Sequence, residues 1–388
     1  MTANTPTDPQ LERKAAAPTR DEPTGSWAAS ATNWRANLAT SLSPRNIGAV
    51  YVLIVICIVF TIWAPQTFPQ LATVKQILDN NAITALAALA LIVPLSAGVF
   101  DLSFAYVMSL SGVTAAHFVA ANNMNVGLAM LIGIGAALII GVINGIVVVG
   151  MQIDSFIGTL ATGSLVQAFI SFVTGDNSIN SIRLDGTFSQ ISQGSIGGII
   201  YPVFYALFIA AALWLFLEHS PTGRRLYATG FNPNAARLAD IRVNKLRFCS
   251  LLTSAGLAGF AGVMLASSLA AGSPSAGTSY LLPAFATVFV GATIFKQGRF
   301  NAWGTIVAVL MLGTGVVGLG LVSAPLWAID MFTGVVLIAA LSANSFERRN
   351  LLRGRGTGSR WLPVRSRTTC LSCGCFSATT LQSKSTAS

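Results

Sequence analysis

The polar side chains inside the apolar segments of this 388-residue chain are mostly neutral. Hydroxyl and amide groups can hydrogen-bond an uncharged, hydroxyl-rich solute, and they can equally join one membrane helix to another. The pattern leaves both uses open, with helix contacts the commoner one for any single residue. The groups in question are Ser109, Ser111, Thr114, Asn144, Thr159, Thr162, Ser164 and Gln167.

Acidic side chains are scarce in the same segments. Asp101 and Asp154 fall where apolar segments end on one side, and Asp330 lies near an end on the other side. An ion-coupled carrier usually places ionisable groups or unwound coordinating elements near the middle of the membrane. The scarcity of acids therefore counts against such a carrier without excluding it. His117, in an apolar segment, is more readily explained as a packed residue than as a ligand.

Motifs for nucleotide hydrolysis and for other catalysis are missing from the chain. No Lys follows a Gly, so there is no phosphate-binding loop of the G-x-x-x-x-G-K type. Neither H-E-x-x-H nor G-x-S-x-G occurs. We therefore expect that the chain is not an enzyme and that ATP-driven transport would need a separate ATPase. We also expect no cofactor and no metal, because Cys370, Cys373 and Cys375 lack a nearby fourth ligand.

One polar segment, Asn232–Ile241, has the pattern of a capped amphipathic helix. Asn232 is a good N-cap, and Pro233 suits the first helical position. Small and apolar side chains then recur at helical spacing, with Arg237 and Asp240 beside them. A short helix between two membrane spans can transmit the motion of a soluble partner, or it can lie in the lipid interface. The segment by itself favours neither interpretation.

The elements that must position these residues are membrane helices. Hydrophobic residues make up 53% of the chain and charged residues only 9%, whereas about a quarter of the residues in soluble domains are charged. Apolar runs of spanning length predict an all-α, polytopic membrane protein with about ten transmembrane helices. The expected spans are residues 47–63, 81–99, 102–121, 126–150, 155–175, 198–217, 248–271, 280–295, 302–322 and 325–343, with a short break near Phe100 and Asp101.

The basic residues lie in the ends and loops, so the formal charge of +10 does not indicate nucleic-acid binding. If the N-terminus is inside, 13 basic residues fall on the inner side without counting the tail, against Lys75 and Arg183 outside. The positive-inside rule then places both termini in the cytoplasm.

This topology divides the chain into three parts. We expect a disordered cytoplasmic arm over residues 1–46, a transmembrane domain over residues 47–345 and a disordered basic tail over residues 346–388. Within the domain, the loop 218–247 is cytoplasmic and carries the helix at Asn232–Ile241. The polar loop 176–197 is external, where it is a connector or a docking surface.

Five segments, in order, resemble the permease subunits of bacterial ABC sugar importers of the ribose, xylose and galactose type. This group belongs to the branched-chain amino acid and sugar permease superfamily. The resemblance covers residues 47–345. It rests on Ala97–Ser103 (similar to Gly-Gly-Ile-Asp-Leu-Ser with one extra residue), Gly141–Gly145, Phe156–Leu160, the segment from Thr222 to Ile241, and the glycine-rich segment from Gly291 to Thr305. The departures are Ser155 in place of Pro, Asp240 in place of Gly, and Ala292, Gln297 and Phe300 in place of Gly.

The resemblance implies a multi-pass protein of the inner (plasma) membrane that carries a sugar or a similar small polar solute. Its implied partners are an ABC ATPase, an external solute-binding protein and a second permease copy, identical or paralogous, within the lipid bilayer. It implies ATPase coupling by Gly230, Asn232, Pro233, Ala235, Ala236, Arg237, Leu238, Asp240 and Ile241. It also suggests that some of Asp101, Ser103, Asn144, Phe156 and Thr159 line or support the solute route, although Asp101 can instead cap the helix that follows it. An ion-coupled secondary carrier and a passive channel remain the alternatives.

Overall fold

The computed structural model describes residues 48–122, 124–294 and 298–338. All of them belong to one unit of the chain, residues 1–344. A second unit, residues 345–388, lies outside the described residues, as do the arm predicted over residues 1–46 and the tail predicted over residues 346–388.

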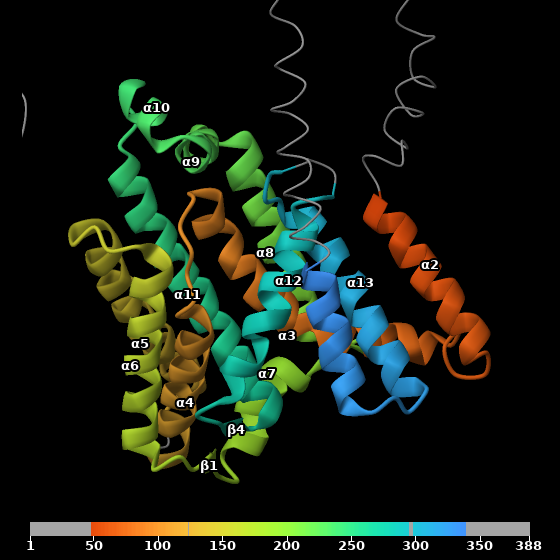
Figure 1. Ribbon diagram of the computed structural model, residues 1–388. Coiled ribbons are helices and arrows are strands. Elements are labelled where there is room, and N and C mark those ends of the chain that lie inside the picture. The colour runs from red at the N-terminus through yellow and green to blue at the C-terminus, as the bar shows by residue number, and fades with distance from the viewer. Residues whose placement is uncertain (1–47, 123, 295–297, 339–388) are drawn as a thin grey trace, which may run out of the picture. The chain divides into compact units, whose positions relative to one another are not determined.

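Within the described residues, seven helices are long and apolar enough to cross a membrane (Figure 1). They are α3 (Leu71–Ser96), α4 (Phe104–Asn122), α5 (Val126–Gly145) with its π-helical continuation Ile146–Gly150, α6 (Ser155–Thr174), α8 (Tyr201–Trp214) with its continuation Leu215–His219, α11 (Val243–Leu269) and α13 (Ala302–Leu321). The all-α class is confirmed.

Three further apolar helices are shorter, and the predicted count of about ten spans is not confirmed. They lie in α2 (Gly48–Trp63), in the 3-10 helix η5 (Ala276–Tyr280) together with α12 (Leu281–Gly291), and over Leu326–Ile338. The segment before α12 shows one physical reason for a shorter helix. Its backbone forms a strand and a 3-10 turn before the α-helix begins, so that α12 has only 11 residues.

Helix α3 begins at Leu71, well before the span predicted from residue 81. Lys75 and Asp79 lower the hydropathy of this stretch, but both side chains have partners. The Lys75 ammonium donates to the carbonyl oxygen of Gly197 at 2.9 Å, and the Asp79 carboxylate accepts from the amide of Ile200 at 3.2 Å. These bonds hold the short hairpin of β2 (Ser195–Ile196) and β3 (Ile199–Ile200) against α3.

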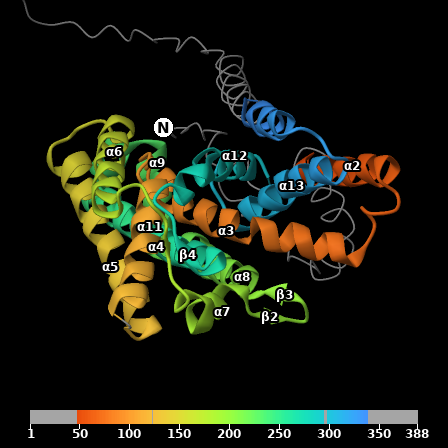
Figure 2. The same ribbon diagram turned by 90° about the horizontal axis from the view of Figure 1, so that it is seen from below.

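The interior is built around α3, α4 and α11. Helix α3 is buried without interruption from Ala82 to Ser96, and α11 packs against α3, α4 and α5. A side chain on Gly262 of α11 would overlap the backbone of Met108 on α4, so glycine permits this close approach. Figure 2 shows α5 and α6 on one side of these helices and α2 and α13 on the other.

The remaining elements gather at the two ends of the helices. One end carries α9 (Pro221–Phe231) and α10 (Pro233–Leu238). The other end carries η3 (Leu184–Phe188), α7 (Ser189–Gln193) and an antiparallel pair of β1 (Ile179–Asn180) with β4 (Ala271–Gly272). The predicted polar loop 176–197 therefore contains short helices and strands, and it buries Leu184, Phe188, Ser189 and Ser192.

Candidate functional site

The predicted break near Phe100 and Asp101 is present and separates α3 from α4. Helix α3 ends in a Schellman motif, in which the amide of Val99 donates to the carbonyl of Pro94 and the amide of Gly98 donates to the carbonyl of Leu95. Gly98 has a φ of +71°, a left-handed conformation that glycine adopts without strain. The chain then runs through Asp101 into α4 without helical hydrogen bonding of its own.

Asp101 is the centre of a buried polar group. Its side chain is 1% exposed, and one carboxylate oxygen accepts from both the amide and the hydroxyl of Ser103, at 3.1 and 2.6 Å. The other oxygen accepts from the hydroxyl of Ser254 on α11, at 2.7 Å. Asp101 therefore supports the start of α4 through Ser103, as its capping alternative predicted, and it also ties the break to α11.

The hydrogen bonding continues from Ser103 across two more helices. The amide nitrogen of Asn144, at the end of α5, donates to the Ser103 hydroxyl at 2.6 Å, and the hydroxyl of Thr162 on α6 donates to the amide oxygen of Asn144. We call the chain of Ser254, Asp101, Ser103, Asn144 and Thr162 the polar chain. It joins α11, the break, α5 and α6, and each of its side chains is buried.

The first turn of α6 supplies the partners that the backbone of the break lacks. The hydroxyl of Thr159 accepts from the amide of Leu102 at 3.0 Å, and the hydroxyl of Ser155 accepts from the amide of Phe100 at 3.1 Å. The amide of Leu102 is buried and needs such a partner, and both side chains take the place of helical hydrogen bonds. Phe156 differs from the other four route candidates because its ring is 49% exposed and meets Phe100 edge to face.

Four of the five predicted route residues thus meet at the break, and Phe156 lies at its surface. Sequence reasoning did not single out Ser254 or Ser155 as partners of these residues. Thr162 was among the neutral polar groups noted in apolar segments, but without a role. Ser254 lies 153 residues from Asp101 along the chain, so no local pattern could have joined them.

The predicted coupling helix is confirmed in its start and wrong in its length. The side chain of Asn232 accepts from the amides of Asn234 and Ala235, both at 3.1 Å, and Pro233 opens α10. However, α10 ends at Leu238 instead of Ile241. Asp240 has a φ of +56°, which a helix cannot contain, and it stands where the resembling sequences carry Gly.

The small side chains of α10 do not form one common face, because some are exposed and one is buried. Leu238 is 91% exposed and Ala235 and Arg237 are exposed too, whereas Ala236 is buried. Ile241 is half-buried beyond the helix. Leu238 is therefore the most exposed apolar side chain of α10.

Helix α9, which sequence reasoning missed as a separate helix, links this surface to the transmembrane helices. Ser220 caps it by accepting from the amide of Gly223 at 2.9 Å, and Pro221 occupies its first turn, so the signal was present in the sequence. Gly230 in its last turn lies directly against the end of α3. A Cβ on Gly98 would come within 3.2 Å of the Gly230 Cα atom, and one on Gly230 would overlap the carbonyl of Ser96.

A second contact of α9 reaches the turn before α13. The Tyr227 hydroxyl donates to the carbonyl of Phe300 at 2.5 Å, and the guanidinium of Arg299 stands 4.1 Å from the centre of the Tyr227 ring. Burial raises the pKa of Tyr227, although the charge of Arg299 opposes this. The phenol therefore stays protonated and remains a donor over the physiological range.

Comparison with known proteins identifies the family of the chain. Residues 74–341 match the family described as branched-chain amino acid transport system / permease component. The ribose import permease protein of Haemophilus influenzae is 30% identical over 68% of this chain and 82% of its own length. That of Bacillus subtilis is 29% identical over 76% and 92%, and the D-allose transport system permease protein of Escherichia coli is 28% identical over 76% and 90%. The resemblance is confirmed: the chain belongs to this permease family and is a multi-pass membrane protein.

Proposed function

We propose that the chain is the permease subunit of an ATP-driven importer that moves a sugar or similar small polar solute into the cell. Its similarity to ribose and D-allose permeases over most of its length supports the solute class. A separate ABC ATPase hydrolyses ATP, an external solute-binding protein delivers the solute, and a second permease copy completes the pathway. Family membership disfavours an ion-coupled carrier and a passive channel.

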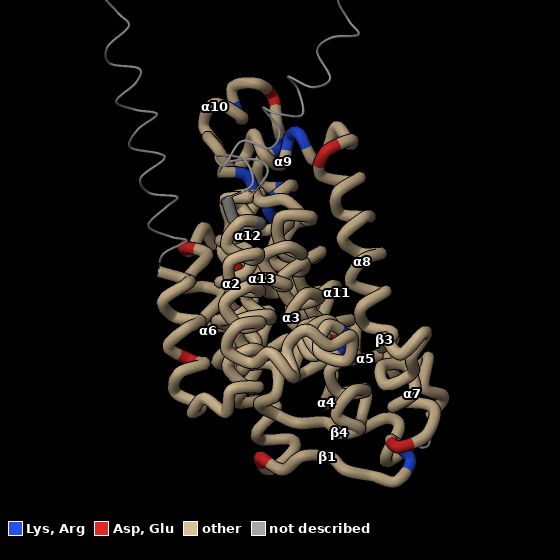
Figure 3. The backbone as a smooth tube through the Cα atoms, turned by 90° about the vertical axis from the view of Figure 1, so that its right-hand side faces the viewer, with Lys and Arg blue, Asp and Glu red and all other residues tan. Residues whose placement is uncertain are grey.

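The distribution of charge supports an orientation with both termini in the cytoplasm. Figure 3 shows Lys and Arg concentrated at the end that carries α9 and α10. The positive-inside rule makes that end cytoplasmic. The opposite end, with α7 and the β1–β4 pair, then faces outward and receives the solute-binding protein.

The observation that carries the proposal is the position of α10. Its exposed Leu238 projects from a short capped helix, and α9 connects that helix to the end of α3. An apolar anchor surrounded by Arg237 and other polar groups is typical of a surface that binds a groove on a soluble domain. In this proposal α10 binds the ATPase, and α9 passes its displacement to Gly98.

The polar chain has a supporting role in this proposal. Asp101, Ser103, Asn144 and Thr159 hold an irregular stretch of backbone in place among the transmembrane helices, where unpaired amides are costly. They therefore position the solute route instead of lining it. Phe156, exposed beside them, is the one predicted route residue with an accessible side chain.

Substitutions of Leu238 test the docking role. The chain is co-expressed with its ATPase and solute-binding protein, and co-purification of the ATPase is measured together with sugar uptake into proteoliposomes containing ATP. Leu238→Asp and Leu238→Arg should both reduce ATPase retention and uptake by at least about tenfold, the effect of losing a central anchor. The control for ATPase retention is Ile182→Asp at the opposite end, where the side chain is 89% exposed, against 91% for Leu238.

The two substitutions also separate docking from a contact with lipid. If α10 only lay in the membrane interface, Leu238→Arg would be harmless, because added positive charge suits an anionic lipid surface. Normal ATPase retention and normal uptake in both variants would refute the coupling assignment.

A further inference from the structure

An irregular polar segment lies beside α4 at membrane depth. Strand β4 ends at Gly272, which packs beside Val113 and Ala116, whereas Gly277 in η5 packs against Ala105 and Ser109. The segment therefore descends along α4 by about eight residues, roughly 12 Å of helix. Non-helical backbone is tolerated at such depth only where protein covers it or where it lines an aqueous cavity.

The hydrogen bonds of this segment leave hydroxyl groups unused. The amide of Gly277 donates to the hydroxyl oxygen of Ser109 at 3.0 Å. Ser109 is 2% exposed, and its own hydroxyl hydrogen has no acceptor among the described residues. Ser273 forms no side-chain hydrogen bond with that part of the chain either. A buried hydroxyl donor without an acceptor is costly, so a ligand or water is expected to supply one.

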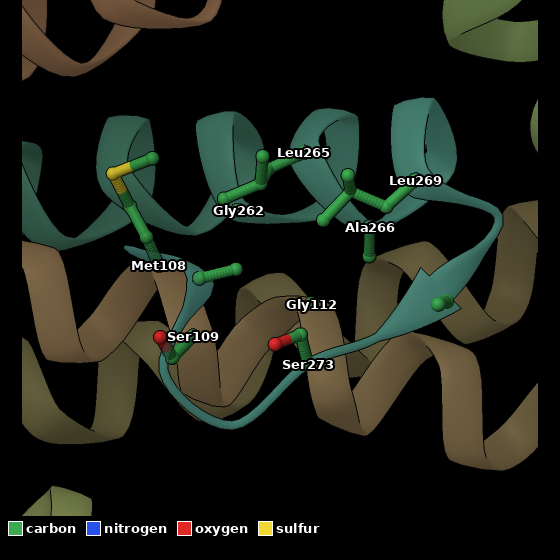
Figure 4. A pocket seen from close by; sticks show the side chains of 10 residues that line it. Met108, Ser109, Gly112, Gly262, Leu265, Ala266, Leu269 and Ser273 are labelled. Carbon is green, nitrogen blue, oxygen red and sulfur yellow. The ribbon is translucent and has the colours of Figure 1, made fainter. Parts of the chain in front are cut away.

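Both hydroxyl groups belong to the lining of one small pocket between α4, α11 and this segment (Figure 4). Its empty volume is about 170 Å³ and is partly open to solvent. Its enclosed part has space for about one water molecule, the size of a single hydroxyl group. The rest of the lining is apolar or glycine, as at Met108, Gly112, Gly262 and Leu265, and no lining residue is charged.

We infer that this pocket binds one hydroxyl group of an uncharged polyhydroxy solute, with Ser109 and Ser273 as its hydrogen-bonding partners. The inference rests on the proposed function and adds a specificity site to it. Ser109 donates to the solute oxygen while its own oxygen holds Gly277 in place. The Ser273 hydroxyl can donate or accept, and the apolar wall formed by Met108 and Leu265 disfavours a charged substituent.

The test compares sugars with their monodeoxy analogues. Uptake of labelled D-ribose, D-allose and L-arabinose is measured in proteoliposomes that contain the complete transporter. The accepted sugar is then competed with each of its monodeoxy analogues. We expect wild type to discriminate against the analogue that lacks the bound hydroxyl, and Ser273→Ala to reduce this discrimination by about 2- to 10-fold, the range expected for one neutral hydrogen bond. Discrimination at the other positions should not change.

Matched variants exclude a merely structural effect. Ser273→Thr keeps the hydroxyl and should keep the preference, and Ser275→Ala removes an exposed hydroxyl of the same segment that does not line the pocket. Ser109→Ala should lower discrimination at the same sugar position. Normal wild-type uptake with unchanged preference in Ser273→Ala would overturn this inference alone. Failure of wild type to take up any of the three sugars would overturn the proposed solute class and the inference with it.

Discussion

The link between Asn144 and Thr162 in the polar chain leads to a quantitative prediction. Asn144 at the end of α5 bonds to Ser103 on one side and to Thr162 of α6 on the other, and all three side chains are buried. Asn144→Ala removes both bonds, and Thr162→Val removes one while nearly preserving shape. A double-mutant cycle with these two changes measures the coupling free energy between the side chains of Asn144 and Thr162.

The expected loss of stability depends on which hydrogen-bond partners Ser103 and Thr162 keep after each substitution. Hydrogen bonds between membrane helices contribute about 0.6 kcal/mol on average and up to about 1.7 kcal/mol. After Asn144→Ala, Ser103 still donates to Asp101, and Thr162 can still donate to the carbonyl of Gly158 at 3.1 Å. Neither hydroxyl is therefore fully orphaned. We expect Asn144→Ala to lower the free energy of unfolding by about 1–3 kcal/mol and the coupling to be about 0.6–1.7 kcal/mol.

The assay is reversible unfolding of the purified chain in mixed micelles by titration with a denaturing detergent. Thr174→Val serves as the control, because the Thr174 hydroxyl bonds only within α6, to the carbonyl of Ile170. Its effect should add to that of Asn144→Ala without coupling. A measured coupling between Asn144 and Thr162 no larger than the scatter of additive pairs, about 0.3–0.5 kcal/mol, would refute the reasoning.

Three further predictions concern coupling, orientation and the tail. Gly98→Ala places a side chain at φ +71° and near Gly230, so we expect the free energy of unfolding to fall by about 1–2 kcal/mol. Uptake should be reduced while ATPase co-purification stays normal, and unchanged uptake would contradict this prediction. Reporter fusions after Gly230 should be cytoplasmic and those near Ser189 external, and a cytoplasmic result near Ser189 would overturn the predicted number of spans. Truncation after Arg349 should leave uptake intact, because no apolar run of spanning length follows it; loss of uptake at normal membrane abundance would show a role for the tail.

Local patterns in the sequence predicted much of the fold. Apolar runs located the long helices, and the N-cap at Asn232 and the break near Asp101 were read from a few residues each. The start of α3 was missed because Lys75 and Asp79 looked like loop residues. Their partners, Gly197 and Ile200, are more than a hundred positions away, and such partners cannot be found by hydropathy.

The sequence was sufficient to select most residues of the candidate site, but not to predict the hydrogen bonds between them. Asp101, Ser103, Asn144 and Thr159 were selected one by one through the family resemblance, and the structure places all four at the break. Ser254 could not be selected, since a serine in a membrane helix is common and only packing against Asp101 gives it a partner. Phe156 was selected with the others, yet its ring lies at the surface because the hydroxyl-bearing face of α6, which carries Ser155 and Thr159, faces the break.

The position of Gly98 connects the break to the surface formed by α9 and α10. Gly98 lies three positions before Asp101, and it packs so closely against α9 that a Cβ on Gly98 would come within 3.2 Å of the Gly230 Cα atom. The backbone of the break is thus held from one side by α9 and from the other by the polar chain. A partner that displaces α9 must move Gly98, and the polar chain then either moves with it or breaks. ATP can drive such a change only through different affinities for the two arrangements. Each hydrogen bond of the polar chain contributes about 1 kcal/mol. A difference of a few kcal/mol between the binding free energies of ATP for the two arrangements is therefore sufficient to break one or two of these bonds.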